Sequence, residues 1–110
     1  MLAMYNPKLS FKKVETVNND LQIYPIQFNA KPPFEATFFH LQPGGETPLD
    51  CHIENECWLV LQGSGILTYA GTPYPLSEQD MFYFDSYKKH QLFNNSQNIL
   101  IICSWFWLPS

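Results

Sequence analysis

The chain is 110 residues long, which is enough for one domain with a single core and too short for two. Its net charge is −4 and its six basic residues are all lysine, which argues against a nucleic-acid partner because such partners require a basic surface. Nine prolines, five glycines and 16% aromatic residues favour an all-β domain built from short strands.

The three cysteines, Cys51, Cys57 and Cys103, contain no C-x-x-C pair, so free thiols in a reducing compartment are the simplest interpretation. The first residues show no basic start followed by an apolar stretch, and we therefore expect no signal peptide. The apolar segment 99–108 is too short to cross a bilayer, which needs about 20 residues. These features predict a cytoplasmic protein without a membrane partner.

The first part of the chain, residues 1–28, mixes polar and apolar groups without a clear period. We expect an N-terminal arm with a short strand near residues 11–17 and a second strand over 21–28. Pro25 lies inside that second strand, which predicts an edge position because proline cannot donate a ladder hydrogen bond. Residues 34–41 predict a firmer strand, since they are rich in aromatic and β-branched side chains.

Residues 44–63 contain three side chains that can bind a metal ion. Asp50, His52 and Glu56 lie at even spacing, and on an extended strand such side chains share one face. Gly44 and Gly63 bound the stretch, as turn residues should.

The strands that follow are apolar on both faces. Residues 57–61 do not alternate between apolar and polar, so another sheet or subunit must cover the outer face. After the turn at 63–65 we expect residues 66–70 to pair back as a hairpin. Residues 74–76 predict a short strand, and residues 99–107 predict a closing strand.

Two stretches resemble the motifs of the cupin family. Residues 44–63 are similar to G-x5-H-x-H-x3-E-x6-G, with Asp50 in place of the first histidine. Residues 79–94 are similar to G-x5-P-x-G-x2-H-x3-N, with His90 and Asn94 in register but with Gln79, Asp85 and Tyr87 replacing Gly, Pro and Gly. The resemblance implies a jelly-roll β-barrel of two antiparallel sheets over residues 29–110, preceded by the arm.

The resemblance also implies one divalent metal ion held by Asp50, His52, Glu56 and His90. Imidazoles and carboxylates together suit Fe, Mn, Ni or Zn. Because aspartate is shorter than histidine, Asp50 either binds the ion directly or orients another ligand. The alternative is a barrel without metal in which both histidines are buried hydrogen-bonding groups, but converging carboxylates and imidazoles favour a cation.

Other residues lie near the motifs but are not predicted metal ligands. Trp58 and Val60 share the parity of Glu56 and are expected to line the barrel interior below the metal, with Trp58 either core filler or a stacking platform. His40 is a lone histidine near a strand end, and Cys51 should point away from the ligands. Lys88 and Lys89 are either solvated loop charges or groups that screen an anionic substrate.

Two classes of function follow from these residues. The first is a metalloenzyme, either a dioxygenase, an isomerase or epimerase, or a lyase, acting on a small molecule in the barrel. The second is a non-catalytic module that binds a small molecule or has a regulatory role. The outward rows of the strands, Cys57, Leu59 and Leu61 with Cys103, Trp105 and Trp107, predict a homodimer, because contiguous apolar rows usually mark interfaces.

Overall fold

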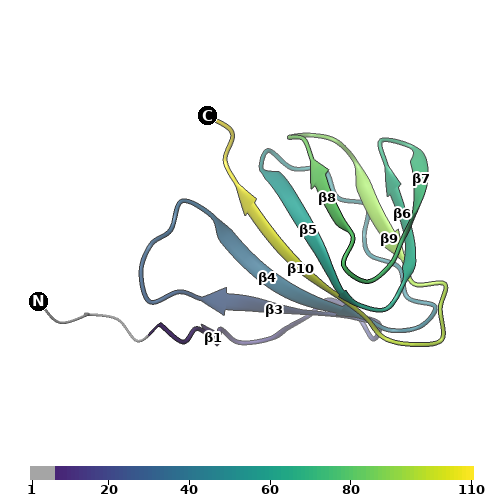
Figure 1. Ribbon diagram of the computed structural model, residues 1–110, viewed down its shortest axis with the longest axis horizontal. Helices are drawn as coiled ribbons and strands as arrows, with labels where there is room; N and C mark the ends of the chain where they lie inside the picture. The colour runs from purple at the N-terminus through teal and green to yellow at the C-terminus, as the bar shows by residue number, and fades with distance from the viewer. Residues whose placement is uncertain (1–6) are drawn as a thin grey trace, which may run out of the picture.

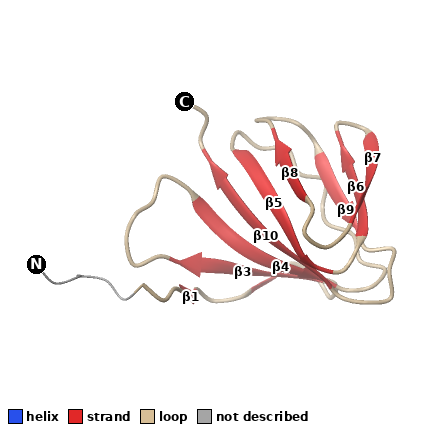
Figure 2. Ribbon diagram, viewed as in Figure 1, coloured by secondary structure: helices blue, strands red, loops and turns tan. Residues whose placement is uncertain are grey.

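The computed structural model describes residues 7–110, and the first six residues of the expected arm lie outside this range. All regular structure within the described range is β-strand (Figure 2). None of these residues forms a helix that is long and apolar enough to cross a membrane. The strands are β1 (Ser10–Phe11), β2 (Glu15–Thr16), β3 (Leu21–Gln27), β4 (Glu35–Leu41), β5 (Asn55–Gln62), β6 (Gly65–Tyr69), β7 (Thr72–Leu76), β8 (Met81–Phe84), β9 (His90–Phe93) and β10 (Leu100–Trp107).

The strands form two antiparallel sheets, which confirms the predicted all-β jelly-roll barrel. The larger sheet has the order β1-β3-β4-β10-β5-β8, with β2 also paired to β3, and the smaller has the order β7-β6-β9. In Figure 1 the smaller sheet lies beside β5 and β8, while β3 and β4 diverge toward the N-terminal arm. Closing strand β10 lies between β4 and β5, so it joins the arm side of the sheet to the motif strand.

The core lies between the sheets and follows the register of the strands. Leu21, Leu41 and Leu100 form one row across β3, β4 and β10, and all three are buried. The smaller sheet contributes Leu67 and Leu92, which are also buried. Alternation along β4 and β10 therefore places the apolar side chains inward, as period-two patterning requires.

The predicted hairpin over residues 66–70 is wrong. β6 pairs with β7 and β9 in the smaller sheet, whereas both neighbours of β5 are strands of the larger sheet. The chain crosses from the larger sheet to the smaller one at Gly63 and Gly65, where its backbone packs tightly against other segments. A Cβ on Gly63 would lie 2.7 Å from the Ile99 carbonyl oxygen. A Cβ on Gly65 would lie 2.7 Å from the Phe93 carbonyl oxygen. Glycine here permits a crossing between sheets instead of a tight turn.

The edge position expected for the strand that contains Pro25 is wrong, because β3 lies between β4 on one side and β1 and β2 on the other. The expected strand over 11–17 is split into β1 and β2, and both pair with β3. Pro25 lies opposite the gap between them, where its carbonyl accepts a hydrogen bond of 2.8 Å from the Lys12 amide. The missing donor of proline is thus placed where no ladder bond is required.

Gly63 gives a direct test of the crossing. Its φ is +90°, a conformation that side chains rarely adopt, so Gly63→Ala is expected to lower the free energy of unfolding by about 2–4 kcal/mol. Gly71→Ala is the matched control, since φ is +84° there but a Cβ would meet nothing within 4 Å. We expect that control to cost only about 1 kcal/mol in urea unfolding. Equal losses in the two variants would contradict the close approach at Gly63.

Candidate metal centre

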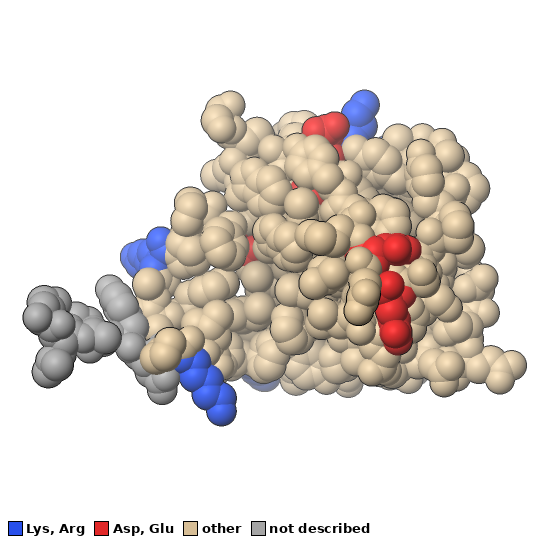
Figure 3. All heavy atoms as spheres, in the orientation of Figure 1, with Lys and Arg blue, Asp and Glu red and all other residues tan. Residues whose placement is uncertain are grey.

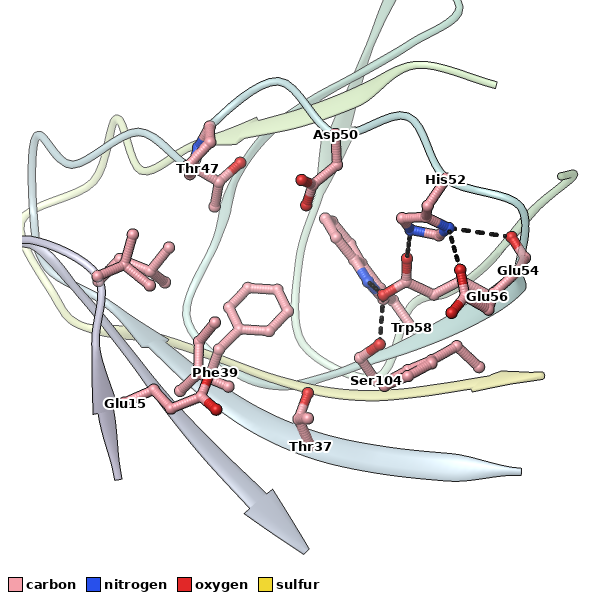
Figure 4. Close-up of a pocket in the computed structure, with 15 residues that line it drawn as sticks. Glu15, Thr37, Phe39, Thr47, Asp50, His52, Glu54, Glu56, Trp58 and Ser104 are labelled. Atoms are coloured by element: carbon pink, nitrogen blue, oxygen red, sulfur yellow. Dashed lines mark hydrogen bonds and ion pairs between the residues drawn. The ribbon is translucent and has the colours of Figure 1, made fainter. Parts of the chain in front are cut away.

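Three side chains from separate segments converge at one point inside the barrel. The Glu56 Oε1 atom lies 3.0 Å from His52 Nε2 and 3.2 Å from His90 Nε2. One ligand atom from each residue lies within 4.8 Å of the others. Figure 4 shows His52 and Glu56 facing one another at one side of a cavity.

Each of these side chains is placed by a different part of the fold. Glu56 is an inward residue of β5 and is only 7% exposed. His90 opens β9, and its backbone exchanges two hydrogen bonds of 3.0 Å with Asp50. The chain bends at residues 53–54, so Asp50 and His52 precede the strand instead of lying on it as expected. This bend, and not strand alternation, turns His52 toward Glu56.

Backbone carbonyls fix the orientation of both imidazole rings. His52 Nδ1 lies 3.1 Å from the Glu54 carbonyl oxygen, and His90 Nδ1 lies 3.1 Å from the Lys88 carbonyl oxygen. A carbonyl oxygen only accepts hydrogen bonds, which assigns the proton to Nδ1 in both rings. In the neutral rings each Nε2 then presents a lone pair toward the Glu56 carboxylate. Such a group of three acceptors fits a cation, and the carbonyl contacts are those that commonly orient histidine ligands.

The second oxygen of Glu56 is held by two donors. Its Oε2 atom accepts a hydrogen bond of 2.8 Å from Trp58 Nε1 and another from the Ser104 hydroxyl. Ser104 lies directly opposite Trp58 in the β10–β5 register and is buried. We did not predict Ser104 from the sequence, although it is the polar residue between Ile102 and Phe106 on the inward row of the closing strand.

His52 and Glu56 of the three donors line a cavity of about 470 Å³, a size typical of small-molecule sites. Its polar lining includes the carboxylates of Glu15, Asp50 and Glu54, and no lysine is among the described residues that line it. The chain contains no arginine. The lining residues are Glu15, Val17, Leu21, Ile23, Thr37, Phe39, Thr47, Pro48, Asp50, His52, Glu54, Glu56, Trp58, Ser104 and Phe106.

A family model described as "Cupin domain" matches residues 37–106, which is more than half of the chain. The chain belongs to the cupin family. The matched residues include all three donors.

Solved structures agree with this assignment at the level of the fold. An RmlC-like cupin from Shewanella frigidimarina has a TM-score of 0.73 at 18% identity, over 86% of this chain and 81% of that one. KdgF from Halomonas sp. has a TM-score of 0.73 at 18% identity, over 86% of each chain. A putative sugar phosphate isomerase from Acidithiobacillus ferrooxidans has a TM-score of 0.61 at 24% identity, over 68% of this chain and 50% of that one.

The degenerate half of the second motif keeps an unusual backbone in this cupin. Gln79 has φ of +72° and Tyr87 has φ of +61°, at the two positions where the family motif has glycine. Asn94, which matches the motif, is fully buried and donates to the carbonyls of Leu41 and Asn98 at 2.9 Å each. Asn94 is therefore a structural residue that ties the end of β9 to the chain around it.

Asp50 lines the cavity but is outside the group of three converging donors. Trp58 lines the cavity and also holds Glu56, so it is neither simple filler nor only a platform. Val60 is buried in the hydrophobic core and is not among the residues that line the cavity.

The cavity lining does not include His40, Cys51, Lys88 or Lys89. His40 packs its ring against Tyr24, with centroids 4.5 Å apart. Cys51 is exposed, and all three cysteines are free thiols, as expected from their spacing. Lys88 and Lys89 are exposed and do not line the cavity.

The hydrogen bonds change the proton affinity of the buried pair. Burial alone would raise the pKa of Glu56, but the hydrogen bonds from His90, Ser104 and Trp58 outweigh burial and lower it. Burial alone would lower the pKa of His90, but its hydrogen bonds with Glu56 and the Lys88 carbonyl raise it. Without a metal ion, a proton between His90 and Glu56 therefore stabilises the site in the way that an ion pair does.

These opposite shifts predict a change of sign in the pH dependence of stability. In metal-free protein, the contribution of His90 is complete below its unfolded pKa of about 6.5 and is lost as pH rises through its raised folded pKa. The contribution of Glu56 is present above its ordinary pKa and is lost only as pH falls through its lowered pKa. The free energy of unfolding of chelated protein is thus expected to fall as pH rises above about 6.5.

Metal-loaded protein should show the opposite slope, because an ion can bind His90 only after its proton has left. Urea titrations between about pH 6 and pH 9, with chelator and with added zinc, measure both slopes. His40→Gln is the control background, since burial lowers the pKa of His40 and gives a contribution that increases with pH. Parallel slopes with and without zinc would contradict the assignment of His90 as a ligand.

Proposed function

We propose that this cupin is a metal-dependent enzyme that holds one divalent ion of Fe, Mn, Ni or Zn on His52, Glu56 and His90. It acts on a small molecule in the adjoining cavity. The observation that carries this proposal is the set of two imidazole nitrogens and one carboxylate oxygen within 4.8 Å, directed at one another beside a cavity of about 470 Å³. Two histidines and a carboxylate are a donor set that suits these ions and leaves coordination positions open.

Bound at these donors, the ion would supply Lewis acidity to an oxygen of the substrate. The residues of the chain supply the rest. Trp58 and Ser104 hold the Glu56 carboxylate in one orientation, which keeps its Oε1 atom directed at the histidines. Phe39 and Phe106 form apolar walls that limit water in the cavity.

Asp50 is the best placed proton acceptor. Its backbone is fixed by two hydrogen bonds to His90, and its carboxylate lines the same cavity outside the donor group. A carboxylate beside a polarised carbonyl favours removal of a proton from the adjacent carbon. The arrangement therefore supports isomerisation, epimerisation or elimination on a hydroxycarbonyl compound, with Asp50 as the base.

The similarity to a putative sugar phosphate isomerase is compatible with this reaction class. The cavity does not suit the phosphate itself, because no lysine is among the described residues that line it and three carboxylates besides Glu56 do line it. A dioxygenase is the second candidate, since two histidines and one carboxylate are also the donor set of many non-haem iron oxygenases.

Solvent exchange and oxygen uptake separate these functions. Metal-loaded protein is incubated in D₂O with a panel of small hydroxyketones and hydroxyaldehydes, and loss of the C–H signal beside the carbonyl is followed by NMR. We expect metal-dependent exchange that Asp50→Asn abolishes while metal content is retained. Oxygen consumption without exchange would favour the dioxygenase. No turnover of either kind would favour a binding module.

We also propose that this cupin forms a homodimer through the outer face of the larger sheet. Leu61, Met81 and Tyr83 are exposed on β5 and β8, and Trp105 and Trp107 on β10 are only partly buried. Most of the surface in view in Figure 3 is uncharged, with its charged side chains in a few separate places. Apolar area of this extent favours a self-complementary interface.

Light scattering at micromolar concentration is expected to report about twice the chain mass of 12.8 kDa. Met81→Lys should yield a folded monomer, because the side chain is 61% exposed in the single chain and its replacement costs little in folding. Tyr74→Lys is the control, since Tyr74 is 43% exposed on β7 of the other sheet. A wild-type monomer would exclude the dimer.

A further inference from the structure

Glu15 occupies an unusual position at the end of an apolar row. The register pairs Glu15 with Ile23, Ile23 with Phe39, and Phe39 with Ile102. Directly opposite residues share one face of a sheet, and Phe39 and Ile102 face the core. The Glu15 carboxylate is therefore on the inner face, where it lines the cavity (Figure 4).

No cation in the cavity neutralises this carboxylate. Among residues 7–110, Glu15 has no side-chain hydrogen bond or ion pair, and no lysine lines the cavity with it. With a divalent ion on the three donors, the carboxylates of Glu15, Asp50, Glu54 and Glu56 still leave the cavity with a net negative charge. An anionic group at the Glu15 end would be repelled, and a cationic group would be attracted.

The Glu15 end lies well away from the metal centre. Three strands, β3, β4 and β10, separate β2 from β5 in the larger sheet. Four strand spacings amount to roughly 19 Å along the curved sheet, and the straight path across the cavity is shorter. Figure 4 shows Glu15 and Phe39 on one side of the cavity and His52 and Glu56 on the other. One ligand that contacts both ends must be elongated.

We propose that the ligand of this cavity is elongated and carries an ammonium group, which Glu15 recognises at the end opposite the metal-binding oxygen. Phe39 lies two strands from Glu15 in the same row and lines the same cavity, and an aromatic face together with a carboxylate is a suitable environment for an ammonium group. The inference rests on the proposed function, because the other end of the ligand binds the metal ion. Glu15 is thus a specificity-determining residue contributed by the N-terminal arm, outside the matched cupin domain of residues 37–106.

Glu15 has one competing role. β2 is an edge strand, and inward-pointing charges on edge strands prevent pairing with other chains. In that role Glu15→Gln would promote self-association without changing ligand preference. Ligand preference and self-association of Glu15→Gln, measured together, distinguish the two roles.

Three probes with the same metal-binding group make the test: an alkyl hydroxamate, its ω-amino analogue and its ω-carboxy analogue, each at several matched chain lengths. Calorimetry with metal-loaded protein is expected to show that the amino probe binds about 3- to 5-fold more tightly than the neutral probe at one optimal length, as exposed ion pairs allow. The carboxy probe should bind most weakly. The preference should decrease in high salt.

Glu15→Gln is expected to remove the preference for the amino probe and to leave affinity for the neutral probe unchanged. Glu35→Gln is the matched control, because it removes the same charge from an exposed position on β4 that does not line this cavity. An unchanged preference in Glu15→Gln, or self-association of that variant as its sole effect, would overturn the inference. Elemental analysis of the same samples separates the two proposals, since a protein that takes up no metal overturns both and a metal-loaded protein that ignores probe charge overturns this one alone.

Discussion

Removal of the metal ion is expected to lower the melting temperature of this cupin by about 10–20 °C. An ion that binds only folded protein adds RT ln(1 + [L]/Kd) to the free energy of unfolding, or about 2.7 kcal/mol at a hundredfold excess over Kd. For a domain of this size, 1 kcal/mol corresponds to about 4–8 °C. The converging acceptors of His52, Glu56 and His90 give the physical reason, because without a cation they face one another inside the barrel.

Differential scanning calorimetry with and without a chelator measures this shift, and readdition of zinc or manganese should restore the midpoint. Glu56→Gln is the control, because it removes the carboxylate that both histidines face. That variant is expected to melt at the same temperature with and without added ion. An unchanged wild-type midpoint after confirmed removal of metal would contradict the site.

The second large effect is the loss of metal from ligand variants. His52→Ala and His90→Ala are each expected to abolish metal retention through desalting, because each removes one of three donors. Asp50→Ala should weaken retention only, since Asp50 lines the cavity outside the donor group. Ser104→Ala is expected to lower metal affinity about 10- to 100-fold, the usual effect of losing a group that orients a ligand.

His40→Ala is the matched histidine control, as its ring packs against Tyr24 and is not part of the donor group. Circular dichroism should confirm that each variant remains folded. Full retention by His90→Ala together with an empty site in Asp50→Ala would reverse the ligand assignment.

The central residues of the site could be predicted from the sequence because motif spacing carries them. His52, Glu56 and His90 lie at the family positions, and all three meet in the structure. The reason given for their meeting was incomplete. We expected a continuous strand from Asp50 to Glu56, whereas a bend at residues 53–54 directs His52 inward.

Long-range contacts could not be predicted in the same way. Ser104 lies 48 residues from Glu56, and only the pairing of β10 with β5 brings the two together. Strand 66–70 was assigned the wrong partner because a glycine pair between two apolar runs is typical of a hairpin. The sequence alone does not show that a Cβ at Gly63 would meet another segment of the chain.

Two positions in the second motif keep the backbone conformation of glycine although the residue there is not glycine. Gln79 and Tyr87 adopt positive φ where the family has glycine, so the degenerate motif still forms the turns on either side of β8. Such a conformation costs about 1–2 kcal/mol for a residue with a side chain. Contacts elsewhere in the barrel must offset that cost, and single-sequence patterns do not show such contacts.

The most direct test of the central claim is elemental analysis of the purified protein, expressed without added metal and desalted before measurement. The arrangement of His52, Glu56 and His90 predicts one divalent transition-metal ion per chain, and none in His90→Ala prepared in parallel. Wild-type protein that contains no metal, and that takes up none when dialysed against iron, manganese, nickel or zinc, would contradict the metal centre.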